Sequence, residues 1–414
     1  METCACGRLA GGFICLPKRT GGVTVKTMAA AIDFGTSKVV TLVAESGGYH
    51  RCDIIGAGQV PYDGYTDGYW NTPEKVTEAI SASIQEAENQ SHRRIREIHV
   101  GVPGEFCRVY VTETTLQLQG VDPHVTPADV ERIFTMADQD IQPVRGVIIH
   151  RSPAWFTVDD GKKTMEPVGM KGSALKTFVS FVVADEFFLN DINRRMQSLG
   201  VEVAGFFSLP MGESLLFLPP EDRDRTAVLI DIGYLNTEIM VVEGDALVFH
   251  KVIPIGGAHI TVDLTYGLEV PMATAEQIKR SYIFGMPGGD TIDAMLENGR
   301  TATFERDAVA RVLEPRVDEI AEEIRKELDE SGVKLGSWSN VYLTGGGLAL
   351  MRGGREYLAS QLDRPVRAPS PKAAKLNSPI FSSSLGLMDL VFETIEQQTE
   401  KSGLFDKLKG LFKK

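Results

Sequence analysis

Two similar segments, about 200 residues apart, constrain the fold of this chain more than any other feature. Residues 29–45 read AAAIDFGTSKVVTLVAE, and residues 227–243 read AVLIDIGYLNTEIMVVE. Each has an apolar run, the motif Asp-x-Gly, a polar turn and a second apolar run that ends in Glu. This pattern is typical of two strands joined by a turn, with the aspartate near the end of the first strand. Two copies predict a duplicated domain with two related halves.

Helical segments alternate with the expected strands, which predicts an α/β architecture with two sheets. Thr-Pro pairs at Thr72 and Thr126 predict two helix starts, because threonine caps a helix and proline fits its first turn. Residues 304–328 are expected to form a helix with a break or kink at Pro315. Residues 339–350 are expected to form a buried strand that runs into a glycine turn and then a helix.

Composition excludes several classes of protein. The net charge of −13 argues against general binding of nucleic acid through its phosphates. The five cysteines are odd in number and irregularly spaced, which argues against a disulfide framework and favours a reducing compartment. No apolar run approaches the ~20 residues that span a bilayer. Residues 1–28 lack the segments of a signal peptide, and we expect a disordered extension upstream of a chain that properly begins at Met28.

Three glycine-containing turns are candidates for nucleotide binding, because small residues let backbone N–H groups approach phosphate closely. In the first turn the candidates are Asp33, Gly35, Thr36, Ser37 and Lys38. In the second turn they are Asp231, Gly233, Asn236, Thr237 and Glu238. In the third turn they are Gly345, Gly346 and Gly347. Asp33 and Asp231, facing each other across a cleft, could hold Mg²⁺, mostly through water. Taken singly, each segment could instead be an ordinary tight turn.

From about residue 29 to its end, the chain resembles the actin/hexokinase/DnaK ATPase superfamily and, within it, the bacterial cell-division family FtsA. AIDFGTSKV resembles the first phosphate loop, LIDIGYLNTEI the second, and VYLTGGGLALMRG the adenosine motif. The resemblance implies an actin-like, duplicated two-lobed ATPase fold with ATP and Mg²⁺ in the cleft between the lobes. It also implies that Gly256 and Gly257 contact the nucleotide and that Glu276 and Lys279 face ribose and adenine. Without the family, the last two would be interpreted as an i,i+3 surface pair.

The segment EPVGMKG, residues 166–172, is the most specific part of the resemblance. It is similar to the Asp-Pro-Val-Gly-Met-x-Gly segment of the family's own subdomain, called 1C, which sugar kinases, actin and DnaK-type chaperones lack. Pilus proteins of the PilM type have a comparable subdomain, so a PilM-like adaptor of a pilus or secretion machine remains an alternative. The implied division is subdomain 1A at 29–104 and 184–225, 1C at 105–183, 2A at 226–257 and 326–392, 2B at 258–325, a linker at 393–402 and an amphipathic helix at 403–414.

The second turn departs from the family pattern Asp-Ile-Gly-Gly-Gly-Thr-Thr-Asp. Tyr234 and Leu235 add Cβ atoms where the backbone must approach phosphate or adopt a positive φ. We therefore expect ATP binding with weak or no ATPase activity. In the superfamily the hydrolytic group comes from the helix before this turn, which makes Glu213 the catalytic candidate; a surface carboxylate is the alternative.

The last twelve residues, GLFDKLKGLFKK, form a cationic end on an acidic chain. On a helical wheel of ~100° per residue, their apolar and basic side chains separate onto opposite faces, which is typical of a helix at a membrane interface. The residues expected to bind membrane are Leu404, Phe405, Lys407, Leu408, Lys409, Leu411, Phe412, Lys413 and Lys414. The alternative is a terminal helix that packs on its own protein.

By the resemblance, the chain is expected to polymerise on the inner face of the cytoplasmic membrane at the division site and to tether the FtsZ ring there. The expected partners are the FtsZ C-terminal peptide, further copies of the chain, other divisome proteins through subdomain 1C, and anionic lipid. Arg316 is expected to contact the acidic FtsZ peptide by charge-assisted hydrogen bonds, unless it is an ordinary surface arginine. A sugar kinase is less favoured because no motif for a catalytic carboxylate base or a sugar pocket is present, and a fast ATPase is less favoured because the second turn is altered.

Overall fold

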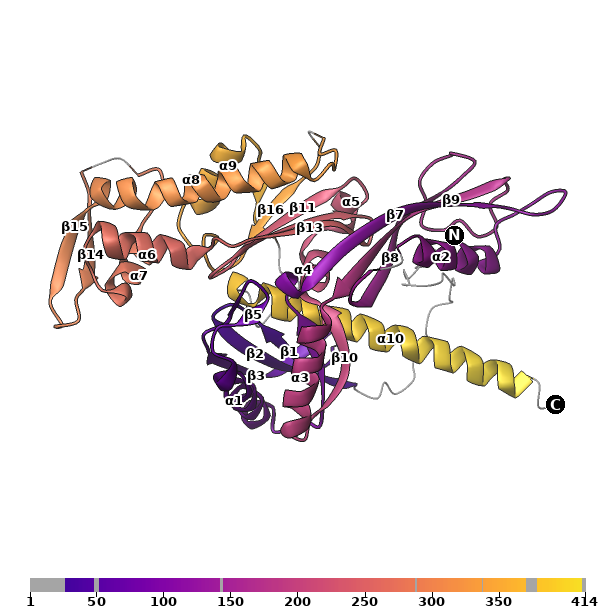
Figure 1. Cartoon of the computed structure of the whole chain (residues 1–414), viewed down its shortest axis with the longest axis horizontal. Coiled ribbons are helices and arrows are strands. Elements are labelled where there is room, and N and C mark those ends of the chain that lie inside the picture. Colours follow the sequence, from indigo (N-terminus) through magenta and orange to yellow (C-terminus); the bar gives the residue numbers. More distant parts are fainter. Residues whose placement is uncertain are drawn as a thin grey trace.

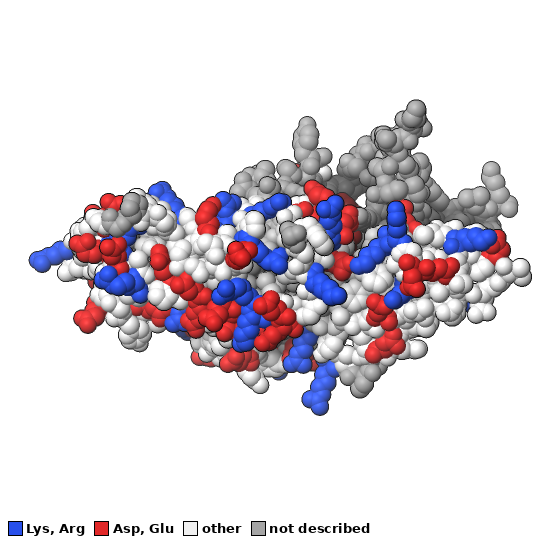
Figure 2. All heavy atoms as spheres, turned by 90° about the horizontal axis from the view of Figure 1, so that it is seen from above, with Lys and Arg blue, Asp and Glu red and all other residues white. Residues whose placement is uncertain are grey.

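The computed structural model describes residues 27–47, 52–141, 144–286, 289–336, 338–369 and 378–411, with side chains up to residue 397. The extension expected at residues 1–28 therefore lies outside the described residues, except for its last two positions. Figure 1 shows two lobes, one below and one above, with a smaller unit beside them. Acidic and basic side chains are interspersed on the face shown in Figure 2.

The lower lobe is built on a sheet of five strands in the order β10-β6-β1-β2-β3 (Figure 1). The first three strands along the chain pair antiparallel, whereas the last two run parallel to β1. Their bounds are β1 Met28–Phe34, β2 Lys38–Ser46, β3 Cys52–Pro61, β6 Glu97–Val102 and β10 Glu202–Ser208. The lobe's helices are α1 Pro73–Ser91, α3 Glu186–Ser198, α4 Leu209–Phe217 and α10 Ser382–Leu411. Its short elements are β4 Tyr65–Thr66, β5 Tyr69–Trp70, η1 Gly104–Phe106 and η2 Pro379–Phe381.

The upper lobe repeats this topology in a sheet with the order β13-β12-β11-β16-β17. Its bounds are β11 Ala227–Ile232, β12 Thr237–Glu243, β13 Ala246–Ile253, β16 Val341–Thr344 and β17 Val366–Arg367. The remaining elements of the lobe are α5 Pro220–Arg223, α6 Gly257–Gly267, α7 Met272–Ser281, β14 Thr291–Met295, β15 Thr301–Glu305, α8 Arg306–Glu330 and α9 Gly354–Leu362. Three antiparallel strands followed by two parallel ones, twice along the chain, confirm the predicted duplicated α/β fold.

The smaller unit, which we call the inserted unit, consists of β7 Cys107–Gln117, α2 Pro127–Asp140, β8 Val147–Val158 and β9 Ala174–Ala184. Its three strands form a separate sheet in the order β7-β9-β8, with its own apolar cluster beneath α2. The unit contacts both lobes: Ser180 Oγ donates to Leu247 O at 2.5 Å, and Ser208 N donates to His150 Nε2 at 3.0 Å.

The predicted helix starts are present, since α1 and α2 begin at Pro73 and Pro127, directly after the two threonines. Thr126 forms a reciprocal cap with Asp129, while Thr72 donates its hydroxyl to Asp63 instead of capping α1. The proline at position 315 does not end a helix, because α8 continues through it to Glu330.

The C-terminal helix corrects one prediction. The sequence predicts a linker at 393–402, whereas α10 runs without interruption from Ser382 to Leu411 (yellow in Figure 1). The expected membrane-binding positions up to Leu411 fall on this helix, but their side chains lie outside the described residues, as do Phe412, Lys413 and Lys414 entirely. Within the described ranges, no helix is long and apolar enough to cross a membrane.

Helices α4 and α10 cross with their backbones in contact at Gly212 and Gly386. A Cβ on Gly386 would lie 2.4 Å from both Cα and N of Glu213, and a Cβ on Gly212 would lie 2.6 Å from Gly386 O. Only glycine therefore allows the two helices to approach this closely.

We expect Gly386→Ala to lower the free energy of unfolding by about 1–3 kcal/mol, because overpacking a tight core costs that much. Urea titration followed by circular dichroism measures this change. Gly205→Ala is the matched control, since a Cβ there would meet only the ring of Phe207 at 3.3 Å. Equal losses in the two variants would contradict the close crossing.

Candidate functional site

The first two candidate turns lie against each other where β1 and β11 end. Leu235 N donates to Thr36 Oγ1 at 3.1 Å, which joins positions 199 residues apart. Each turn is closed in the same way, since Gly35 N donates to Lys38 O at 3.0 Å and Gly233 N donates to Asn236 O at 2.9 Å. The two similar segments of the sequence therefore face each other across the junction of the lobes.

The second turn is also held by two other segments of the upper lobe. Gly347 N donates to Ile232 O at 2.7 Å, Gly257 N to Gly233 O at 2.9 Å, and Ala258 N to Tyr234 O at 2.8 Å. A Cβ on Gly257 would lie 2.6 Å from Gly347 Cα, and a Cβ on Gly256 would lie 2.7 Å from Tyr234 O. These glycines allow the second turn, the third turn and the start of α6 to pack backbone against backbone.

The third turn contains two more of the candidate glycines. Gly345 has a φ of +89°, and a Cβ there would lie 2.0 Å from Asp231 Oδ1, so only glycine fits. Gly346 is exposed.

The altered second turn is not strained. Neither Tyr234 nor Leu235 has a positive φ, so the backbone strain expected from these replacements is absent. The side chain of Tyr234 extends toward solvent and is 46% exposed.

A cluster of carboxylates occupies the junction of the lobes. Asp33 is buried, and its Oδ2 accepts hydrogen bonds from Ser383 at 2.7 Å and Ser384 at 2.5 Å. Burial raises the pKa of Asp33, although these two hydroxyls and the charge of Lys38 oppose the shift. Burial and the neighbouring charge of Glu238 raise the pKa of Asp231 to about 7.

Glu213 lies in α4 within the same cluster and is buried, which contradicts the alternative of a surface carboxylate. Burial and the charge of Asp231 raise the pKa of Glu213 well above its ordinary value.

Four buried side-chain atoms at this junction have no hydrogen-bond partner within the described part of the protein. They are Asp33 Oδ1, Glu213 Oε1, Asp231 Oδ1 and Asn236 Nδ2. Buried polar atoms are nearly always satisfied, and exceptions mark places where water, an ion or a ligand binds. Three acceptors and one donor fit a hydrated cation beside a group that carries acceptor oxygens. The described residues contain no group of three or more His, Cys, Asp or Glu side chains able to hold a metal ion.

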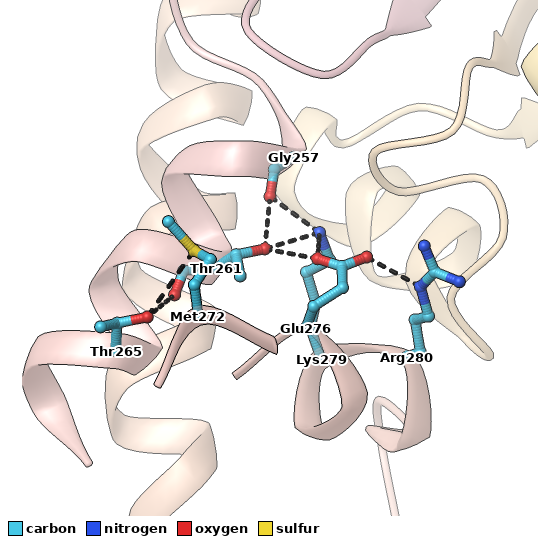
Figure 3. A network of polar contacts seen from close by, with 7 residues as sticks. All are labelled: Gly257, Thr261, Thr265, Met272, Glu276, Lys279 and Arg280. Carbon is cyan, nitrogen blue, oxygen red and sulfur yellow. Dashed lines mark hydrogen bonds and ion pairs between the residues drawn. The ribbon is translucent and has the colours of Figure 1, made fainter. Parts of the chain in front are cut away.

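Lys279 is buried and Glu276 is half-buried, so the two belong to a polar network within the upper lobe rather than to a surface pair (Figure 3). Lys279 Nζ lies 3.0 Å from Gly257 O, 2.8 Å from Thr261 Oγ1 and 2.6 Å from Glu276 Oε2. Arg280 Nε donates to the other oxygen of Glu276 at 2.8 Å. Burial lowers the pKa of Lys279, while its contact with Glu276 opposes the change. The network fixes the first turn of α6, and the expected contacts with ribose and adenine stay a prediction.

Other candidate side chains are engaged inside the protein. Lys38 Nζ lies 4.6 Å from the ring centre of Phe381 and 3.4 Å from Gln59 Oε1. Thr237 Oγ1 donates to Ile255 O at 2.7 Å, and Glu238 pairs with His250 at 3.0 Å. Ser37 contributes its backbone oxygen, which accepts from Tyr62 N at 3.1 Å. The last three candidates therefore each make a contact within the protein.

Arg316 lies away from this junction, on α8. Its Nε and Nη2 donate to the two carboxylate oxygens of Asp263 at 2.6 and 3.0 Å, and its Nη1 contacts Glu319. Arg316 is therefore not an unpaired surface arginine, and any acidic ligand must share its guanidinium with two carboxylates.

The sequence reasoning missed Ser383 and Ser384, which contact Asp33 directly. The only local signal is a run of three serines before an apolar helix, at 382–384. Such a run is equally typical of a helix start, so it does not indicate a site.

Two family models match the chain. One, described as cell division protein FtsA, matches residues 228–386. The other, described as the SHS2 domain inserted in FtsA, matches residues 104–183. The second match covers β7, α2, β8 and β9, so the inserted unit is the part that this model describes.

Curated relatives named cell division protein FtsA match nearly the whole chain. The relative from Pseudomonas aeruginosa is 29% identical over 371 residues, covering 87% of this chain and 88% of its own. The relative from Bacillus subtilis is 25% identical over 378 residues, covering 90% of this chain and 85% of its own.

Solved structures with the same fold include actin-like proteins of other functions. A chain of the PilM-PilN type IV pilus biogenesis complex has a TM-score of 0.59 and 18% identity, covering 89% of this chain and 99% of its own. MreB 5 of Spiroplasma citri bound to AMPPNP has a TM-score of 0.54 and 12% identity, covering 91% of this chain and 98% of its own. At these identities the structures establish the fold alone, whereas the two family models and the curated relatives agree on one family. The chain belongs to the FtsA family of actin-like bacterial cell-division proteins.

Proposed function

We propose that this cell-division protein binds ATP with Mg²⁺ between its lobes, forms filaments, and tethers FtsZ polymers to the cytoplasmic side of the membrane at the division site. The observation that carries nucleotide binding is the group of four unpartnered buried atoms on Asp33, Glu213, Asp231 and Asn236. The AMPPNP-bound MreB structure, which shares the fold, supports this choice of ligand.

Asp33 and Asp231 would hold the hydrated Mg²⁺, and the turns that carry Thr36 and Asn236 would hold the phosphates. The metal ion would neutralise charge where carboxylates and phosphate meet. The Thr36–Leu235 hydrogen bond is a direct link between the two turns, so any change in the angle between the lobes must alter or break it. For this reason we propose that the nucleotide sets the lobe angle that favours polymerisation.

ATP hydrolysis is expected to be weak or absent. The turn proposed to hold the phosphates carries Tyr234 and Leu235 where the family pattern has glycines, which disfavours fast hydrolysis. Glu213 remains the candidate for the hydrolytic group, because it is the acidic side chain of the helix before that turn. The proposed role of the nucleotide is therefore to stabilise a conformation rather than to supply rapid turnover.

The C-terminal residues 403–414 are the proposed membrane tether. Full burial of a Leu or Phe side chain is worth ~1.5–3 kcal/mol, and each Lys near an anionic leaflet adds about 1 kcal/mol. Only part of each apolar side chain is buried at an interface, so one tail binds weakly and reversibly. Several tails on one filament bind tightly, because later contacts are effectively intramolecular. Filament formation and membrane residence are thereby coupled.

Asp231→Asn is expected to weaken the binding of Mg²⁺–ATP roughly tenfold or more, because an interaction with a charged group is lost. Stability should not fall, since the change removes a charge from a cluster of carboxylates. A fluorescent ATP analogue measures affinity, and thermal unfolding measures stability. Asp293→Asn, on β14, is the control. Unchanged affinity in Asp231→Asn would count against this site.

A chain that ends at Ser402 is expected to lose most of its sedimentation with anionic lipid vesicles, because it lacks the apolar and basic residues of the tail. Vesicle pelleting with ATP, compared with the intact chain, measures the loss. Neutral vesicles serve as the control for the charge contribution. Equal pelleting of the two chains with anionic vesicles would exclude the tether.

Arg316→Glu is expected to abolish binding of a peptide with the FtsZ C-terminal sequence, measured by fluorescence anisotropy. Asp263→Asn is the matched control, because it breaks the same ion pair but leaves the arginine available. The control should bind the peptide at least as well as the unmodified chain. If both variants lost binding equally, the ion pair would matter for structure and Arg316 would not be a contact.

A further inference from the structure

The last described helix begins inside the carboxylate cluster. Ser383 and Ser384, in the first turn of α10, both donate to Asp33 Oδ2, although they lie 350 and 351 residues from it in the chain. Ser384 is 2% exposed, so its hydroxyl has been withdrawn from water to make this contact. Two donors on one carboxylate oxygen fix the plane of the carboxyl group.

This arrangement determines which oxygen of Asp33 remains available. Oδ2 is saturated by the two serines, while Oδ1 is buried and has no partner within the described residues. Without the hydroxyls the carboxyl group could rotate, and burial would favour its neutral form. The serines oppose the rise in the pKa of Asp33 that burial causes, so they also favour the charged form.

The same helix contacts the second carboxylate of this lobe. Its Gly386 lies against the backbone of Glu213 in α4, where a Cβ would come within 2.4 Å. Ser382, the first residue of α10, donates its hydroxyl to Pro379 O at 2.9 Å, and its proximity lowers the pKa of Glu213 against the larger effect of burial. The first five residues of α10 therefore touch both acidic groups that the lower lobe contributes to the site.

We propose that Ser383 and Ser384 are positioning residues of the nucleotide site: they hold Asp33 so that Oδ1 faces the hydrated Mg²⁺ of the bound nucleotide. This inference rests on the nucleotide binding proposed above. It also gives α10 a second role, because the helix that begins at this carboxylate runs unbroken to Leu411, in the segment proposed to bind membrane. Binding of Mg²⁺ and nucleotide at the site therefore restrains the first turns of that helix.

The double variant Ser383→Ala/Ser384→Ala tests the assignment on the full chain. Affinity for a fluorescent ATP analogue is measured with Mg²⁺ and with EDTA. In the unmodified chain, Mg²⁺ should strengthen binding; in the variant, binding should be roughly tenfold weaker with Mg²⁺ and unchanged with EDTA. Thr394→Ala is the matched control, since its hydroxyl bonds only to Leu390 O within the same helix.

Hydrogen exchange supplies a second readout. The nucleotide with Mg²⁺ should slow exchange of the amides of residues 382–390 in the unmodified chain and in Thr394→Ala, relative to α3, and should not do so in the double variant. If the double variant does not fold, Ser383→Ala alone is tested instead, because Ser383 is the more accessible of the two serines. A smaller loss of affinity for the ATP analogue with Mg²⁺ is then expected.

The outcomes separate the two proposals. A variant that keeps the full effect of Mg²⁺ on affinity and on exchange overturns the role of the serines but leaves nucleotide binding intact. An unmodified chain that binds no ATP analogue overturns both. Loss of affinity that is equal with Mg²⁺ and with EDTA assigns the serines to folding of the site and also overturns their positioning role.

Discussion

The structure depends on the burial of like charges where its two lobes meet. Asp33, Glu213 and Asp231 come from β1, α4 and β11; the charges of Asp33 and Asp231 raise the pKa of Glu213, and the charge of Asp33 also raises the pKa of Asp231. Burying several carboxylates together is unfavourable unless partners compensate. The serines of α10 supply part of that compensation, and four buried polar atoms at the junction have no hydrogen-bond partner among the described residues. A cation and a polar ligand would complete the arrangement.

The rest of the fold brings these groups together. Duplicated sheets place two aspartates at equivalent strand ends, and glycines at 257, 345 and 347 let the second turn pack tightly. The buried ammonium of Lys279 then fixes the start of α6 against that turn (Figure 3). On the other side, the glycine crossing of α4 and α10 positions Glu213. The site is therefore assembled from both lobes and from the last helix, so its state is sensitive to their relative position.

Much of this could be predicted from sequence, because repeated local patterns determine it. The similarity between residues 29–45 and residues 227–243 predicted the shared sheet topology, and the Thr-Pro pairs predicted where α1 and α2 begin. Contacts made by segments outside this repeat could not be predicted. No local pattern indicates that Ser384 meets Asp33, or that Gly386 buries Glu213. The polar residues 393–402 were interpreted as a linker, yet they include several glutamates and glutamines, which are good helix formers, and they continue α10.

Proton release on nucleotide binding tests the central claim most directly. The pKa of Asp231 is raised to about 7, so part of the free protein carries a proton there at neutral pH. A Mg²⁺ ion nearby stabilises the charged carboxylate and expels that proton. Titration calorimetry of Mg²⁺–ATP at pH 7, in buffers with different enthalpies of ionisation, measures the exchange. The account predicts net release of protons from the protein; binding without release, or with uptake, would contradict it.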